Sequence, residues 1–170
     1  HGLSAGEIAG RFEHTALGPL DYPCVGDWVL VRGHDAAGPK IIERVLDRSS
    51  LLARKRAGSD RSAQAIAANV DYVLLVQSCN ADFNPRRLER YIVAVAESGA
   101  EAIVVLNKAD LDESSQFSYA AVTTHRVSAL PGEGLESLSP YLQAGRTAVL
   151  VGSSGVGKST LVNRLSGGAH

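Results

Sequence analysis

Near its C-terminus the chain reads Gly152-Ser153-Ser154-Gly155-Val156-Gly157-Lys158-Ser159-Thr160. These residues match the phosphate-loop pattern G-x-x-x-x-G-K-[ST]. Glycines let a backbone fold around a phosphate with its N–H groups pointing inward, at the positive end of a helix dipole. Lys158 brings a positive charge to the outer phosphates, and the Ser159 hydroxyl is a candidate magnesium ligand. The pattern predicts a nucleoside triphosphate site; the alternative is an ordinary strand–turn–helix corner.

The residues on either side of this loop support that prediction. Arg146–Val151 is a short apolar run typical of a buried strand, and Ser159–Leu165 has the amphipathic pattern of a helix. The strand, the loop and the helix therefore agree with the motif.

Further upstream, two nearly continuous apolar runs predict strands that are covered on both faces: Val70–Val76 and Ala102–Leu106. Between them, Asn84 and Pro85 predict the start of a helix that Gly99 closes. This alternation predicts an α/β domain, with helices packed on a parallel sheet, that includes the phosphate loop. The other side of the helix is expected to be a solvated basic face formed by Arg86, Arg87 and Arg90.

The four residues Asn107-Lys108-Ala109-Asp110 directly follow the second apolar run. They stand at the carboxyl end of a predicted parallel strand, where ligands bind in open α/β sheets. The Asp110 carboxylate can accept hydrogen bonds from the ring N–H and the exocyclic amine of guanine, a donor pair that adenine lacks. Lys108 can lie along the base, and Asn107 can tie the loop to its neighbours. We therefore predict a guanine nucleotide, with a polar helix-starting turn as the alternative.

A second loop, Val127-Ser128-Ala129-Leu130, follows a strand-like segment at Val122–Arg126 and leads through Gly134 into another helix. It resembles the S-A-[LK] loop whose backbone contacts the guanine oxygen. Ser128, Ala129 and Leu130 are therefore added to the predicted nucleotide-binding residues.

The N-terminal part of the chain has a different pattern. Three of its segments read as short strands: Gly6–Phe12, Val25–Val31 and Lys40–Leu46. Closely spaced strands with glycine turns predict a small, incomplete β-barrel with an oligonucleotide-binding fold over residues 1–56. Phe12, Tyr22 and Trp28 are candidates for stacking on bases, but for Trp28 burial in the barrel core is the preferred prediction.

A basic stretch over residues 54–62 breaks the strand pattern, and residues 57–69 are predicted to be a linker. Arg54, Lys55 and Arg56 either contact RNA phosphates or form a solvated connection. The charge run alone favours the solvated connection.

The bulk composition limits the classes of function. A net charge of −1 gives the chain no global attraction to nucleic acid or membranes, so any RNA contact must be local. Cys24 and Cys79 lie far apart and indicate neither a zinc site nor a disulfide framework, which fits a reducing compartment. No apolar run approaches about 20 residues and the start lacks a signal sequence. We therefore expect a cytoplasmic protein without a membrane partner.

The order of the motifs is informative. In ordinary Ras-like GTPases the phosphate loop comes first, whereas here Asn107–Asp110 and Ser128–Leu130 precede Gly152–Ser159. A circular permutation produces this order. With it, the chain resembles the circularly permuted ribosome-assembly GTPases, in particular the ribosome small-subunit-dependent GTPase A family. The resemblance also covers Asp21–Val29, Ala67–Asp71 and Asp82–Tyr91.

The resemblance implies an oligonucleotide-binding barrel, a permuted GTPase domain over residues 70–170 and a C-terminal zinc-binding domain. It implies GTP and GDP as ligands with magnesium, and slow GTP hydrolysis in which Lys158 takes part, stimulated by the small ribosomal subunit. The implied role is late maturation of that subunit, with ribosomal RNA as a partner, and we expect a monomer.

Several parts of the family pattern do not follow Thr160: a switch threonine, a D-x-x-G loop and the zinc ligands. Asp35-Ala36-Ala37-Gly38 matches D-x-x-G only by letter, and Thr123–Arg126 is interpreted as a strand rather than a switch. We therefore expect a fragment that binds guanine nucleotide weakly and has negligible turnover on its own.

Two other classes of protein remain as alternatives. A P-loop ATPase or small-molecule kinase would share the phosphate loop, which does not distinguish bases. A non-catalytic RNA-binding fragment would rest on the barrel and the basic stretch.

Overall fold

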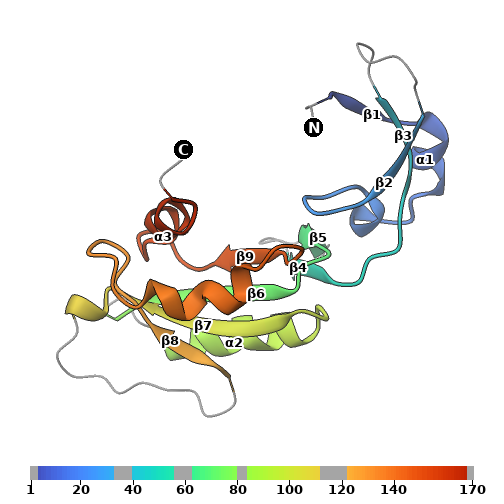
Figure 1. Cartoon of the computed structure of the whole chain (residues 1–170). Coiled ribbons are helices and arrows are strands. Elements are labelled where there is room, and N and C mark those ends of the chain that lie inside the picture. Colours follow the sequence, from blue (N-terminus) through green and yellow to red (C-terminus); the bar gives the residue numbers. More distant parts are fainter. Residues whose placement is uncertain (1–3, 33–39, 56–62, 80–83, 112–121, 168–170) are drawn as a thin grey trace. The chain divides into compact units, whose positions relative to one another are not determined.

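The computed structural model describes residues 4–32, 40–55, 63–79, 84–111 and 122–167 of the chain. The chain divides into two compact units, His1–Asn69 and Val70–His170 (Figure 1). In the described residues no helix is long and apolar enough to cross a membrane.

The second unit is built on a four-stranded parallel sheet with the strand order β8-β7-β6-β9. Its strands are β6 (Tyr72–Ser78), β7 (Glu101–Asn107), β8 (Thr124–Arg126) and β9 (Ala148–Val151). The central strands β6 and β7 are almost wholly buried, as their continuous apolar sequences predict. All strands run the same way, so their carboxyl ends meet at one edge of the sheet.

Each strand is followed by a helical segment: β6 by α2 (Pro85–Ala96), β7 by η2 (Ala109–Leu111), β8 by η3 (Leu135–Leu142) and β9 by α3 (Lys158–Leu165). The start of α2 is as predicted, because the Asn84 side chain accepts a hydrogen bond from the Arg87 backbone N–H and Pro85 follows at the first position. The helix expected after Gly134 is a 3₁₀-helix. Pro140 lies inside it and cannot donate the backbone hydrogen bond of a regular α-helix.

One apolar cluster fills the space on one side of the parallel sheet. Its buried members are Leu74, Val76, Ile103, Val105, Val127, Ala129, Leu138, Val156 and Leu161. Val156 belongs to the phosphate loop and Leu161 to α3, so burial of these two side chains fixes the loop and its helix to the sheet.

The first unit holds two small sheets, one three-stranded with the order β1-β3-β2 and one two-stranded, β4-β5. The elements are β1 (Gly6–Ile8), α1 (Gly10–Thr15), η1 (Pro19–Asp21), β2 (Val29–Arg32), β3 (Lys40–Val45), β4 (Leu51–Lys55) and β5 (Ala63–Ala68). In the described residues these sheets are separate, so the predicted incomplete β-barrel is not confirmed.

Four predictions for this unit are wrong. The segment Gly6–Phe12 is a strand only to Ile8, and a helix starts at Gly10. The strand predicted from Val25 starts at Val29, because Gly26 adopts a left-handed φ of 90° in a turn.

The predicted linker, residues 57–69, contains β5, which pairs antiparallel with β4. Trp28 is 71% exposed rather than buried in a barrel core. The segment Asp35–Gly38 and residue Arg56 lie outside the described residues.

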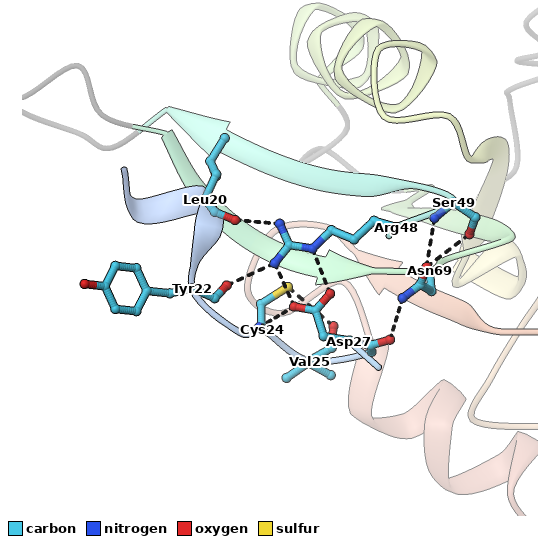
Figure 2. Close-up of polar contacts among 9 residues, drawn as sticks. Leu20, Tyr22, Cys24, Val25, Asp27, Arg48, Ser49 and Asn69 are labelled. Carbon is cyan, nitrogen blue, oxygen red and sulfur yellow. Dashed lines mark hydrogen bonds and ion pairs between the residues drawn. The ribbon is translucent and has the colours of Figure 1, made fainter. Parts of the chain in front are cut away.

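An ion pair fixes the Leu20–Asp27 turn of the first unit (Figure 2). The Arg48 guanidinium donates to both carboxylate oxygens of Asp27 at 2.7 Å and to the carbonyls of Leu20 and Tyr22 at 2.5 and 3.0 Å. The Asp27 side chain is 1% exposed and that of Arg48 is 15% exposed. Burial alone would raise the pKa of Asp27, but hydrogen bonds from Arg48 and from the Cys24 backbone hold this pKa below its ordinary value.

The Asn69 side chain also holds this turn, through hydrogen bonds to two other segments of the unit (Figure 2). Its side chain donates to the carbonyl of Gly26 at 3.0 Å and accepts from the backbone N–H of Ser49 at 2.9 Å. These contacts join the end of β5 to the turn that precedes β2. Asn69 itself has a left-handed φ of 54°, a conformation that asparagine tolerates better than most residues.

Candidate functional site

The phosphate-loop sequence lies between β9 and α3, as predicted. Gly155 and Gly157 adopt left-handed φ angles of 80° and 94°, which glycine tolerates without strain. The ammonium group of Lys158 donates to the carbonyls of Gly152 and Ser153, at 2.9 and 2.6 Å. The loop therefore curls around the lysine side chain at the start of α3.

Two glycines of this loop are needed because other groups approach them closely. A Cβ on Gly152 would collide with the carbonyl of Val76 at the end of β6, and one on Gly157 would collide with the Asn107 side-chain amide. The loop thus packs directly against the carboxyl ends of β6 and β7. The positions of these two glycines in the motif are therefore required by packing against the sheet as well as by the course of the loop backbone around a phosphate.

Asn107 joins all three predicted loops. Its side chain, 2% exposed, donates from Nδ2 to the carbonyl of Val156 at 2.8 Å and accepts at Oδ1 from the backbone N–H of Ala129 at 3.0 Å. One buried amide therefore connects the Asn107–Asp110 loop to both the phosphate loop and the Ser128–Leu130 loop. This confirms the prediction that Asn107 connects its loop to the neighbouring loops.

The Ser128 side chain supports the neighbouring loop. Its buried hydroxyl accepts a hydrogen bond from the backbone N–H of Asp110 at 2.9 Å. Lys108 adopts a left-handed φ of 62°, and the Asp110 residue is exposed at the carboxyl edge of the sheet. Such backbone conformations are uncommon outside glycine and concentrate at ligand sites. Asp110 is thereby held in place through its backbone while its carboxylate stays accessible.

Two arginines contribute contacts that the sequence analysis missed. Arg87, predicted on a solvated face of α2, donates from Nη1 to the Ser153 hydroxyl of the phosphate loop. Arg164 of α3 donates from Nη2 to the carbonyl of Leu130 at 2.5 Å. The available signal for Arg87 was its place in the first turn of the helix that follows β6, whose carboxyl end lies beside the loop. Arg86 and Arg90 are exposed, as predicted.

A magnesium ion fits the chemistry at the start of α3. Ser159 is exposed in the first turn, next to Lys158, so its hydroxyl is available as an oxygen ligand. Within the described part of the chain, no group of three or more His, Cys, Asp or Glu side chains is placed to hold a metal. A cation here would therefore also need oxygens from a bound phosphate and from water.

Sheet order and loop order together define the class of this protein. Two solved structures share its architecture. YjeQ from Thermotoga maritima has a TM-score of 0.73 and 27% identity, and the match covers 96% of this chain and 56% of that chain. YloQ, described as a circularly permuted GTPase, has a TM-score of 0.62 and 26% identity, and the match covers 97% of this chain and 56% of that chain. The chain has the α/β architecture of a circularly permuted GTPase.

The family follows from sequence matches. The family model for the RsgA GTPase matches residues 45–170. A small ribosomal subunit biogenesis GTPase RsgA 2 of Lactiplantibacillus plantarum is 42% identical over 98% of this chain and 49% of its own length. An RsgA of Xanthomonas campestris pv. campestris is 46% identical over 84% of this chain and 40% of its own length. This chain belongs to the RsgA GTPase family, and it spans about half the length of these relatives or less.

Proposed function

We propose that this protein binds GTP and GDP at Gly152–Thr160, hydrolyses GTP to GDP and phosphate, and acts in biogenesis of the small ribosomal subunit. The observation that carries the nucleotide site is the pair of hydrogen bonds made by buried Asn107, which connect the phosphate loop to both base loops. The relatives' names, small ribosomal subunit biogenesis GTPase, support the biological role.

The choice of guanine rests on Asp110 and the residues around it. Its carboxylate is exposed at the carboxyl edge of the sheet, and its backbone is held by Ser128. Guanine offers two adjacent N–H donors to one carboxylate, whereas adenine offers no such pair. The backbone of Ser128–Leu130 is assigned to the guanine oxygen, and Lys108 to the face of the base.

The phosphates are assigned to the loop itself. Lys158 is already oriented by the carbonyls of Gly152 and Ser153, so its ammonium group binds the outer phosphates without first being reorganised. Magnesium, held through Ser159, supplies neutralisation of phosphate charge when it is bound. Hydrolysis also requires a positioned water.

We propose ribosomal RNA as the partner of the first unit. On the β2–β3 pair, Leu30 lies opposite Arg44, and the Leu46 backbone N–H donates to the Trp28 carbonyl. Cross-strand partners share a face, so these four exposed side chains form a mostly apolar surface that includes one aromatic ring and one arginine. Aromatic rings that stack on bases and arginines that contact phosphates are the usual components of RNA-binding surfaces. An oligonucleotide-binding barrel, a monomeric state and a cytoplasmic location are also part of this proposal; zinc is assigned to no residue described here.

Competition binding tests the proposed nucleotide. Labelled GDP bound to the chain is displaced by unlabelled GTP and, as we expect, not by ATP at equal concentration. Equal displacement by ATP would contradict the assignment of Asp110 and favour a P-loop ATPase or kinase. The family match makes that alternative and a non-catalytic RNA-binding fragment the less favoured functions.

A further inference from the structure

Arg87 lies in the first turn of α2, next to the end of the central strand β6. The Asn84 side chain fixes its backbone by accepting the Arg87 N–H at 3.0 Å, and the following residue, Leu88, is fully buried. The base of the Arg87 side chain is therefore held rigidly against the sheet. Its guanidinium group reaches the Ser153 hydroxyl, 66 positions later in the chain.

Ser153 is consequently held by two basic side chains. Arg87 donates to its hydroxyl, while Lys158 donates to its carbonyl at 2.6 Å. Arg87 is half-buried, whereas its neighbours Arg86 and Arg90 are exposed. A half-buried arginine with a neutral hydroxyl as its partner keeps its positive charge close to the phosphate loop.

We propose that Arg87 is a positioning residue for nucleotide binding: through Ser153 it holds the phosphate loop in the conformation in which Lys158 faces the phosphates. This inference rests on the proposed function of the loop. It makes α2 part of the phosphate site, although its sequence is separate from every nucleotide motif. Changes in the position of α2 are then transmitted to the loop by a single contact.

A double-mutant cycle on the full 170-residue chain tests this role. The variants are Arg87→Ala, Ser153→Ala, the double variant and Arg87→Lys, with Arg90→Ala as a matched control that removes an exposed arginine from the same helix. Binding of labelled GDP is titrated for each variant, and the unfolding midpoint without nucleotide is recorded.

We expect Arg87→Ala and Ser153→Ala each to weaken GDP binding about five- to tenfold, the effect of one lost hydrogen bond of ordinary strength. The double variant should be no weaker than Arg87→Ala by more than about twofold, because both changes remove the same contact. Arg87→Lys should recover part of the affinity, and Arg90→Ala should bind GDP like the unsubstituted chain. If Arg87→Ala does not fold, Ser153→Ala tests the contact alone, since it removes only a hydroxyl.

Three results would overturn the inference. These are unchanged GDP affinity in Ser153→Ala, additive losses in the double variant, or an equal loss in Arg90→Ala, which would indicate general charge rather than the contact. A chain that does not bind GDP even without substitution would instead overturn the proposed function, and this inference with it.

Discussion

In the parallel sheet of Val70–His170 two polar residues that join the loops of the candidate site are buried, whereas in the small sheets of His1–Asn69 large apolar residues are exposed. Asn107 and Ser128 are both 2% exposed and each makes hydrogen bonds to a neighbouring loop. Trp28, Leu30 and Leu46 project from their sheet into solvent. The first arrangement fixes the loops of the proposed nucleotide site, and the second leaves an exposed surface where we propose that RNA binds.

The two units also differ in what holds them together. The second unit depends on one apolar cluster that includes residues of the phosphate loop itself. The turn that precedes β2 in the first unit depends on the Asp27–Arg48 ion pair and on Asn69. A substitution in one unit should therefore affect one activity and leave the other intact.

The largest expected effect is that of Lys158→Ala on nucleotide binding. Removing the ammonium group deletes the main positive charge of the loop, and we expect GDP affinity to fall about 100-fold. Isothermal titration with GDP measures this loss. Association with ribosomal RNA through the first unit should not change in the absence of nucleotide; a parallel loss there would contradict the separation of the two activities.

The next effect concerns the stability of the first unit. Asp27→Asn leaves the guanidinium of Arg48 without its anionic partner, and we expect a loss of about 2–3 kcal/mol in the free energy of unfolding. Hydrogen exchange of the backbone amides in this unit follows its unfolding separately from that of the second unit. GDP binding by the second unit should be retained.

The same ion pair gives a pH dependence with a definite sign. The folded-state pKa of Asp27 is lowered, so its contribution to stability is complete above its unfolded pKa of about 4 and is lost as the pH falls through the folded value. Urea unfolding between neutral and acidic pH should show a steeper acid-side loss in the unsubstituted chain than in Asp27→Asn. Equal slopes would exclude Asp27 as a source of acid sensitivity.

The smallest expected effect is that of Trp28→Ala on RNA binding. One stacking interaction is worth about 1–3 kcal/mol, so affinity for a single-stranded RNA probe should fall at least about fivefold. Because the side chain is exposed, the unfolding midpoint should hardly move. Thr15→Ala, at an exposed residue of α1 in the same unit, is the control; an equal loss of RNA binding there would contradict a role for the Trp28 surface.

The sequence predicts secondary structure best where a local pattern of residue types directly reports the element, as in an apolar run or a helix cap. Continuous apolar runs located β6 and β7 to within two residues, and Asn84-Pro85 located the start of α2. Motif residues were assigned by spacing alone, and the structure brings their loops together through Asn107.

The wrong predictions concern features that contacts between distant segments of the chain determine. Alternation in Val25–Val31 does not tell which face of the strand is covered, and Trp28 lies on the exposed face. The sequence of β5, AQAIAA, is rich in alanine, which has little strand preference, so it was interpreted as linker. The contact of Arg87 with Ser153 joins segments that are 66 positions apart, so no local pattern in the sequence predicts it.

Nucleotide competition with an altered base loop tests the central claim most directly. Labelled GDP on the chain is challenged with GTP, ATP and xanthosine triphosphate, for the unsubstituted protein and for Asp110→Asn. The account predicts that GTP alone competes well with the unsubstituted chain, and that Asp110→Asn shifts preference from guanine to xanthine, whose second carbonyl accepts a hydrogen bond from the new amide. Equal competition by ATP, or an Asp110→Asn variant with unchanged base preference, would contradict it.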